Sequence, residues 1–276
     1  MKRIALILFL FPFLWSASMQ AQCSQDYISL FPKGETIEAN GLIVIEANGM
    51  AQKVVNELTF LHPIYLQSSS HKVYLTLKES RTGQVDQTQV LLLPESALIA
   101  GEDYELKVDG LEADEKRFFQ REDEQGNSFF ISWTVSSEEY NEPPVWKGLP
   151  KFGMLMHDKQ GECERTVYAT FGVEIEAPYE VLIKTEVFDI IANTNSVYYL
   201  QANERGLWVG CEHRGGAFDL VENHNYKVRF DVLDAVGNAT GDWTDWVSFQ
   251  VPEYKQKVTR IPRWNCLPDD YPELLE

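Results

Sequence analysis

The sequence predicts an all-β protein made of two antiparallel β-sandwiches in tandem, and three observations lead to this prediction. A heptapeptide that starts with leucine and ends with tyrosine occurs twice, at 98–104 (LIAGEDY) and 220–226 (LVENHNY). A turn of the form D-x-x-G-N also occurs twice, at 123–127 and 234–238. Around these repeats, short stretches that alternate apolar and polar residues are separated by turn residues, with no convincing amphipathic helix.

The leucine-to-tyrosine heptapeptide predicts a bend that leads into a strand. Its middle holds Gly101 in the first copy and Asn223 in the second, and both residue types tolerate positive φ. After each tyrosine, apolar and polar residues alternate, as in a half-buried strand. The residues expected to form the two corners are Leu98, Tyr104, Leu220 and Tyr226.

Together, the corner and the D-x-x-G-N turn resemble the bacterial immunoglobulin-like and fibronectin type III-like modules of exported surface proteins. In such modules a tyrosine near the start of a strand ties down the crossing between sheets. The resemblance implies Ig-like sandwiches that act as spacers, adhesin stalks or accessory domains rather than as catalysts. The first module departs from the pattern, because Tyr104 lies 19 residues before Asp123, whereas Tyr226 lies eight before Asp234. We therefore expect an acidic insertion or an extra hairpin there.

The chain is expected to divide into four parts. Residues 1–21 are a signal peptide, 24–140 the first module, 141–253 the second and 254–276 a proline-containing tail. Pro143 and Pro144 make a stiff joint between the modules, because proline fixes φ and cannot extend a strand ladder.

In the first module, one apolar run contains a proline, and no strand is predicted in one acidic stretch. Pro63 interrupts the run 58–66 and indicates an edge strand or a bulge. The acidic stretch 112–124 is interpreted as a solvated loop, and a turn is expected at 80–83. The expected strands lie at 42–47, 58–66, 73–77, 85–93, 104–108 and 129–135.

In the second module, strands are expected on both sides of the second corner. The pattern of the last strand places Trp243, Val247, Phe249 and Val251 on one apolar face. The expected strands lie at 163–175, 181–191, 197–200, 207–211, 226–232 and 243–251.

The amino terminus predicts export to the periplasm, the cell surface or the medium. Lys2 and Arg3 precede an apolar run of twelve residues at 4–15, and small and polar residues follow to Ala21. An uncleaved anchor is the alternative, although a spanning helix needs roughly 20 apolar residues. Residues 20–22 (QAQ) do not resemble a lipobox before Cys23, and no later segment predicts a membrane span in the mature chain.

The charge balance argues against nucleic acid as a partner. The formal charge is −18, and removal of the two basic residues of the signal leaves −20, which is 22 minus 42. A field of this sign repels nucleic acid and anionic membranes. The alternative interpretation is that acidity only keeps an exported protein soluble.

Four cysteines in an exported chain indicate two disulfides, with three pairings to choose from. The alternation of the strand from Val167 onward, extended backward, points Cys163 inward, and Cys211 shares a face with Leu207 and Val209. We therefore expect Cys163 to pair with Cys211. By elimination, Cys23 then pairs with Cys266.

The sequence carries no catalytic motif that we recognise, and it predicts no cofactor except a candidate calcium site. None of the five histidines forms a metal-binding pair such as H-E-x-x-H. Acidic residues cluster at both ends of the 112–124 stretch, and calcium is bound by six to eight oxygens. The candidate ligands are Asp109, Asp114 and Asp123, and the alternative is a charged loop in water.

Aromatic residues give the candidate ligand-binding surface. Trp246 shares parity with the polar residues of the last strand, which points it away from the core that is expected to hold Trp243. Tyr198 and Tyr199 are adjacent, so one of them should face outward. An exposed ring can stack on a sugar or anchor a protein. The alternative for Trp246 is packing on the joint, the first module or the tail.

These observations favour an exported, non-enzymatic binding or structural module, of the adhesin or scaffold kind. Its expected partner is a protein or a glycan at the cell surface. The alternative is a carbohydrate-binding accessory protein or a hydrolase that uses carboxylates at the rim of a sandwich, since glycoside hydrolysis requires a carboxylate pair.

Overall fold

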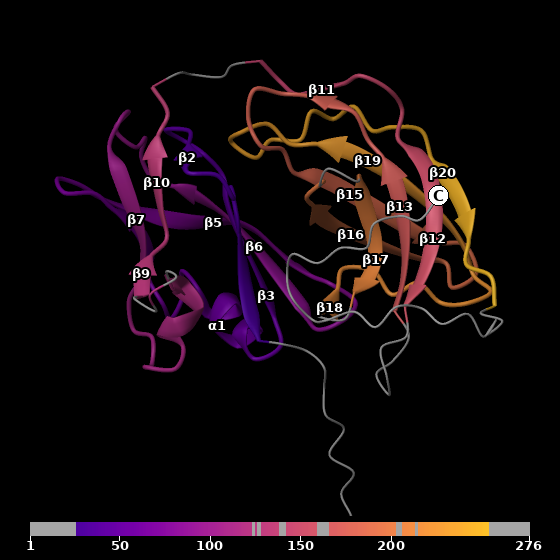
Figure 1. Cartoon of the computed structure of the whole chain (residues 1–276), viewed down its shortest axis with the longest axis horizontal. Helices are drawn as coiled ribbons and strands as arrows, with labels where there is room; N and C mark the ends of the chain where they lie inside the picture. The colour runs from indigo at the N-terminus through magenta and orange to yellow at the C-terminus, as the bar shows by residue number, and fades with distance from the viewer. Residues whose placement is uncertain are drawn as a thin grey trace, which may run out of the picture.

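The chain folds into an all-β structure, as the sequence predicts. The computed structural model describes residues 26–122, 125, 128–137, 142–158, 166–202, 206–212 and 215–253. Two groups of strands lie next to each other, one up to β10 and the other from β11 to β20 (Figure 1). Among the described residues, no helix has the length and the apolar content needed to cross a membrane.

Eight strands of the first module form one sheet in the order β1-β3-β6-β5-β4-β7-β10-β2. Neighbours in this sheet are antiparallel, except that β10 and β2 run parallel. The strands are β1 (Tyr27–Phe31), β2 (Thr36–Ile37), β3 (Ile43–Asn48), β4 (Ile64–Gln67), β5 (Lys72–Thr82), β6 (Gln87–Pro94), β7 (Asp103–Val108) and β10 (Ser132–Val135).

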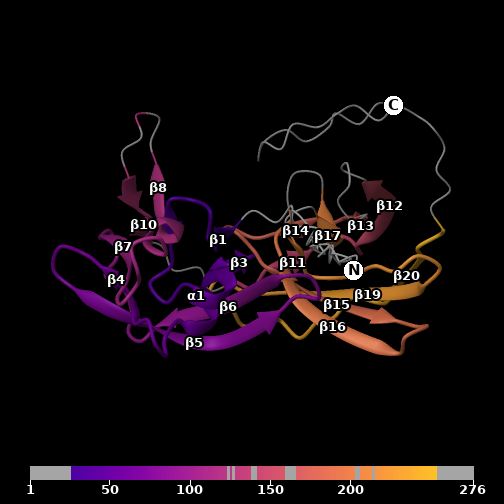
Figure 2. The same ribbon diagram turned by 90° about the horizontal axis from the view of Figure 1, so that it is seen from below.

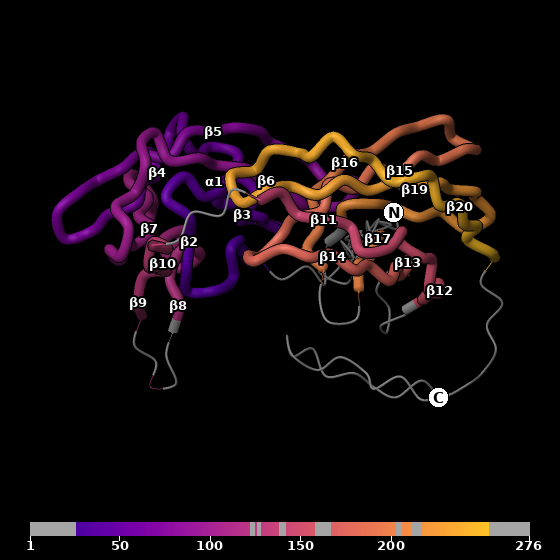
Figure 3. Tube along the Cα trace, turned by 90° about the horizontal axis from the view of Figure 1, so that it is seen from above, coloured from indigo at the N-terminus to yellow at the C-terminus, as the bar shows by residue number. Residues whose placement is uncertain are grey.

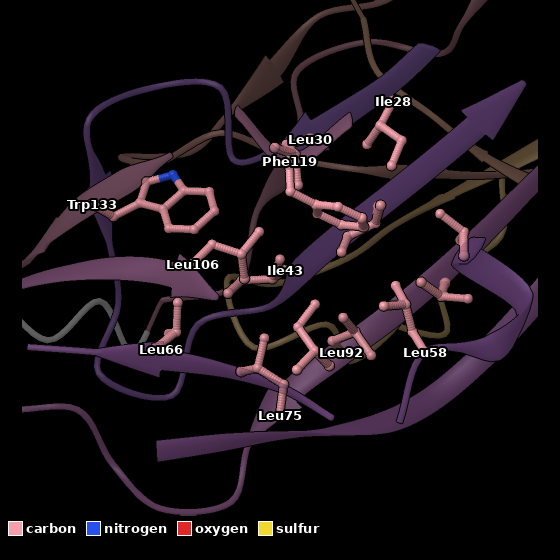
Figure 4. Close-up of a cluster of buried hydrophobic side chains, with 14 of the residues drawn as sticks. Ile28, Leu30, Ile43, Leu58, Leu66, Leu75, Leu92, Leu106, Phe119 and Trp133 are labelled. Carbon is pink, nitrogen blue, oxygen red and sulfur yellow. The ribbon is translucent and has the colours of Figure 1, made fainter. Parts of the chain in front are cut away.

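The long strand β5 lets this sheet curl over its own core. Its first residues pair with β4, and from Leu75 onward it pairs with β6 instead. The two halves of the sheet therefore face each other, and their apolar side chains form one cluster. Figure 4 shows Ile43 and Leu92 from one half opposite Leu66, Leu106 and Trp133 from the other.

The strand predicted at 58–66 forms only from Ile64 onward, so the first half of that prediction is wrong: a short helix ends at Glu57, and a turn closed by an isolated bridge between Leu58 and His62 follows it. Helix α1 (Ala51–Glu57) buries Ala51, Val54 and Val55, which recur at helical spacing on one face. β4 starts only after Pro63 and is paired on both sides, by β5 and β7, so the strand is not an edge. The proline marks where the strand begins.

The acidic stretch 112–124 is more than a solvated loop: it contains the first strand of the extra hairpin that was expected there, and a 3-10 helix that was not. The 3-10 helix η1 (Lys116–Phe119) buries Phe119, and β8 (Gln120–Glu122) then pairs with β9 (Ser128–Phe130). This hairpin projects from the first module in Figure 2 and accounts for the longer spacing after Tyr104. The predicted strand 129–135 is accordingly split, since β9 ends at Phe130 and β10 begins at Ser132.

The second module contains two four-stranded sheets, in the orders β12-β13-β17-β18 and β16-β15-β19-β20, and a small sheet of β11 and β14. Side chains of both four-stranded sheets form one core cluster, including Phe171 from the first and Phe230 from the second. The strands are β11 (Val145–Trp146), β12 (Lys151–Asp158), β13 (Thr166–Gly172), β14 (Ile175–Glu176), β15 (Ile183–Asp189), β16 (Thr194–Leu200), β17 (Leu207–Glu212), β18 (Gly215–Gly216), β19 (Asn225–Val232) and β20 (Val247–Gln250).

Each corner tyrosine is buried and bonded to the bend before it. The hydroxyl oxygen of Tyr104 accepts a hydrogen bond from the backbone N–H of Ile99 at 3.2 Å, and that of Tyr226 accepts one from Val221 at 2.8 Å. Within the bends, Gly101 has φ of 78° and Asn223 has φ of 64°. The same hydrogen bond, five residues back along the chain, therefore fixes both bends.

Replacing Tyr226 with phenylalanine is expected to reduce the free energy of unfolding by about 1 kcal/mol, because the N–H of Val221 loses its partner. Tyr104→Phe should cost a similar amount. Urea unfolding measures both. Tyr65→Phe is the control, because that hydroxyl bonds Asp109 at the surface and its loss should change stability by less than about 0.5 kcal/mol. Equal stability of Tyr226→Phe and the wild type would contradict a stabilising role of the corner.

A third apolar cluster joins the two modules. Phe31, Leu42, Val44 and Leu91 of the first module pack with Leu182, Tyr199 and Leu233 of the second. Hydrogen bonds surround the cluster: the N–H of Leu42 donates to the carbonyl of Ala235, and the side-chain amide of Gln89 donates to the carbonyl of Tyr199, each at 2.9 Å. Figures 1 and 3 both show the two groups of strands side by side along this contact.

The second D-x-x-G-N turn lies in this interface. The carboxylate of Asp234 accepts hydrogen bonds from the N–H groups of Val236 and Asn238, at 3.1 and 2.7 Å, which closes the turn. Gly237 has φ of 77°, and a Cβ atom there would lie 2.9 Å from the side chain of Leu42. Glycine is therefore required both by the turn and by the close approach of the first module. Most of the first copy, 123–127, lies outside the described residues.

Candidate functional site

The candidate site is the outer face of the β16-β15-β19-β20 sheet. Successive side chains of a strand point to opposite faces. In β19, Tyr226, Val228 and Phe230 belong to the module core, so Lys227 and Arg229 lie on the other face. Both are only partly buried.

Two tryptophans contact the cations of this face. The guanidinium carbon of Arg229 lies 4.6 Å from the ring centroid of Trp243 and 4.6 Å from that of Trp246. The ammonium of Lys227 is 4.7 Å from the ring of Trp246, and that of Lys184 is 5.5 Å from the ring of Trp243. Cations and rings thus alternate in the order Lys227, Trp246, Arg229, Trp243, Lys184, which we call the Trp–Arg ladder. Such contacts are worth about 0.5–1 kcal/mol each at exposed positions.

The charge of Arg229 is neutralised within the ladder, whereas the charges of the lysines are not. The Nε of Arg229 lies 2.5 Å from a carboxylate oxygen of Glu186, whose other oxygen accepts a hydrogen bond from Asn195. In the described part of the chain, no carboxylate lies within 4.0 Å of the ammonium of Lys184 or Lys227. Arg229 is therefore held in place, while the two lysines keep net positive charge.

Both tryptophans lie on this face because the last strand starts later than its alternation indicates. β20 begins at Val247, so the parity of the strand does not extend to Trp243. The prediction of a core position for Trp243 is therefore wrong. Thr244, between the two tryptophans, is buried: its N–H donates to the carbonyl of Phe230, and its hydroxyl accepts from the N–H of Phe230. Trp246 contacts cations of its own sheet.

Neither tyrosine of the 198–199 pair is accessible. Tyr198 is 1% exposed and lies in the core of the second module. Tyr199 does point away from that core, but it is 4% exposed because the first module covers it. The expectation that one of these rings is free for a ligand is wrong, because local parity gives the face of a residue but not what packs on that face.

The described acidic residues that were proposed as calcium ligands are either bonded to other side chains or exposed. Asp109 accepts a hydrogen bond from the hydroxyl of Tyr65 at 3.0 Å and lies 3.8 Å from the ammonium of Lys72. Asp114 is exposed in the turn before η1, and Asp123 lies outside the described residues. Where the structure describes the chain, no group of three acidic, histidine or cysteine side chains could hold a metal ion.

The disulfide predictions fall mostly outside the described residues. This holds for Cys23, Cys163 and Cys266. The backbone of Cys211 lies in β17 opposite Gly216, but its side chain is not described. Both pairings stay predictions.

A histidine–carboxylate pair lies beside the second corner, and no spacing in the sequence indicates it. The Nδ1 of His224 lies 2.6 Å from one carboxylate oxygen of Asp189. The other oxygen accepts hydrogen bonds from the N–H groups of Ile191 and Ala192, each at 2.9 Å. Burial alone would raise the pKa of Asp189, but the N–H of Ala192, the His224 ring and the N–H of Ile191 together hold it below its ordinary value.

This depressed pKa predicts loss of stability in acid. A carboxyl whose pKa is lower in the folded state stabilises the fold above its unfolded pKa, near 3.9, and loses that contribution as pH falls through the folded value. The wild type should therefore lose melting temperature as the pH falls below about 4. Asp189→Asn should be less stable at pH 6 but should lose less on acidification. Parallel acid losses in the two proteins would contradict this assignment.

Comparisons with known proteins identify no family. No family model matches the chain, and no curated protein matches it. Among solved structures, the chain is similar to pullulanase type I from Bacillus subtilis in complex with maltose, at a TM-score of 0.23 and 8% identity, over 81% of this chain and 24% of that one. It is also similar to pullulanase from Anoxybacillus sp. LM18-11 in complex with maltotriose, at a TM-score of 0.23 and 11% identity, over 77% and 25%. The chain thus spans about a quarter of these enzymes, and we draw no conclusion from the likeness.

Proposed function

We propose that the chain is an exported, non-enzymatic binding module built from two tandem Ig-like or fibronectin type III-like sandwiches. The leader-like residues 1–21 support export. The two tyrosine corners support the Ig-like assignment, because in each a buried hydroxyl holds the bend before a strand.

The observation that carries the binding function is the Trp–Arg ladder. Its rings and cations are partly exposed on a sheet face, although tryptophan and arginine are among the residues that contribute most to binding. The buried interface between the modules adds a structural role, because it holds this face in a fixed orientation relative to the first module.

A carbohydrate-binding accessory role is the second candidate, and the same face favours it. Tryptophan side chains beside hydrogen-bonding cations suit a sugar, which offers apolar ring faces and polar edges. The hydrolase alternative would require a carboxylate pair across a cleft. Glu186, the carboxylate that pairs with Arg229 in the ladder, is also bonded to Asn195.

A glycan array combined with product analysis tests this proposal. We expect the purified chain to be retained on at least one glycan and to release no new reducing ends from it. Release of product would show an enzyme and overturn the non-enzymatic assignment. Secretion of the chain from a bacterial host, with loss of residues 1–21 by mass spectrometry, tests export separately.

A further inference from the structure

We propose that the Trp–Arg ladder binds a linear acidic polysaccharide, one that carries carboxylate groups on its sugar rings. This inference rests on the proposed binding function and names the chemical class of its ligand. It depends on two features of the outer face of the second module: unneutralised cations, and their alternation with aromatic rings.

The two lysines of the ladder have no anionic partner in the described structure, and a bound anion would supply one. In the described structure neither Lys184 nor Lys227 has a carboxylate within 4.0 Å of its ammonium, and the ammonium of Lys227 also lies 4.8 Å from the ring of Phe188. Both residues are partly buried, so their stems are held against the sheet while the charge of each ammonium is not paired with a carboxylate of the described chain. A ligand carboxylate would supply the missing partner.

The alternation of cations and rings indicates a linear, repeating ligand. Lys227 and Lys184 lie at opposite ends of the ladder, with Trp246, Arg229 and Trp243 between them. Lys227 pairs with Phe188 in register, four residues along β15 from Lys184. At roughly 3.3 Å per residue this separates the two lysine positions by about 13 Å along the sheet. An acidic polysaccharide that lies along the ladder presents a carboxylate and an apolar ring face at each sugar, which an acidic peptide does not.

The overall negative charge does not prevent this contact at physiological salt. Exposed charges more than a Debye length away, about 8 Å at 0.15 M, are largely screened. Two carboxylates of the same face lie beside the ladder: Glu186 is bonded to Arg229, and Asp231 lies opposite Lys184 in the sheet register. The nearby Asp231 is buried and already accepts hydrogen bonds from Thr240 and from the N–H of Gly241.

The two lysines are the residues to change, because Arg229 holds the tryptophans in place. Replacing Lys184 and Lys227 with glutamine removes the charges but keeps a stem that packs on the rings. Lys53→Gln is the matched control, since that lysine lies on α1 of the first module and its side chain is 72% exposed. Melting temperatures of all variants should match that of the wild type.

The test measures binding of the full chain to polygalacturonate at 0.15 M salt, with its methyl ester as the uncharged polymer of the same backbone and poly-glutamate as an acidic peptide. We expect binding to polygalacturonate only. Each lysine variant should weaken it about fivefold and the double variant about 25-fold, with Lys53→Gln unchanged.

Equal binding of the ester, equal binding of poly-glutamate, or unchanged affinity of the double variant would each overturn the ligand assignment. Absence of binding to all three polymers would also overturn it. None of these outcomes decides the proposed function, whose non-enzymatic assignment fails instead if the glycan array shows release of product. The two conclusions can therefore fail separately.

Discussion

Replacing Phe171 with alanine is expected to lower the free energy of unfolding by about 3–5 kcal/mol. Phe171 in β13 is fully buried, and its ring lies 5.2 Å from that of Phe230 and 5.9 Å from that of Phe249. These two partners belong to the opposite sheet, so the ring connects both sheets of the second module. Truncation leaves a cavity that well-paired strands on either side cannot close. Urea unfolding followed by tryptophan fluorescence measures the loss.

Phe152→Ala is the matched control for this prediction. Phe152 stacks in the same aromatic group, 5.8 Å from Phe171, but it is 38% exposed and lies in the outer strand β12. Its truncation removes less buried area and should cost about 1 kcal/mol. If the two variants lost equal stability, or if Phe171→Ala lost less than the control, the two sheets would not share a core at this point.

The strands were predictable from the sequence wherever one face of a strand is buried and the other is not. In β15 the burial of Ile183, Thr185 and Val187 alternates with partly exposed residues, and β19 behaves in the same way. A period of two is a local property, so it can be recognised without knowing the neighbours. The corners were predictable for the same reason, since seven consecutive residues carry both the positive φ and the tyrosine.

Features that depend on distant neighbours could not be predicted in this way. Helix α1 has only seven residues, too few for a helical period to stand out. The turn expected at 80–83 is displaced, because β5 continues to Thr82 in pairing with β6. Tyr199 faces outward from its module, but only the fold brings the first module over it.

Only part of the candidate site could be predicted from the sequence. Trp246 was identified from its parity, but its partners Lys227 and Arg229 were not, although they occupy the polar positions of the strand that follows Tyr226. Adjacent strands of a sheet place their outward residues side by side. Comparing the polar positions of neighbouring strands would therefore have indicated a cationic and aromatic face.

Replacing Tyr199 with alanine is expected to uncouple the unfolding of the two modules. The ring is 4% exposed in the cluster between the modules, and its hydroxyl donates a hydrogen bond to a carboxylate oxygen of Glu79 at 2.5 Å. Burial, followed by the bond to Glu79, raises the pKa of this phenol, so it is protonated and can donate. Loss of the ring should cost about 3–5 kcal/mol of stability.

The more informative measurement on this variant is whether the two modules unfold together or at different urea concentrations. In the wild type, the backbone N–H of Leu42 in the first module is bonded to the carbonyl of Ala235 in the second, so loss of one module exposes the other. Hydrogen exchange of segments 40–47 and 228–235 in rising urea should therefore give coincident transitions in the wild type. In Tyr199→Ala the two segments should lose protection at different urea concentrations.

Tyr199→Phe distinguishes packing from hydrogen bonding at this interface. It keeps the ring between the modules and removes only the bond to Glu79, whose carboxylate keeps its ion pair with Arg81. The expected loss is about 1 kcal/mol, with the two transitions still coincident. If Tyr199→Phe separated the transitions as fully as Tyr199→Ala, the hydrogen bond rather than the apolar cluster would couple the modules. If Tyr199→Ala left them coincident, the remaining contacts would be sufficient, and Tyr199 would not be the residue on which the fixed orientation of the Trp–Arg ladder depends.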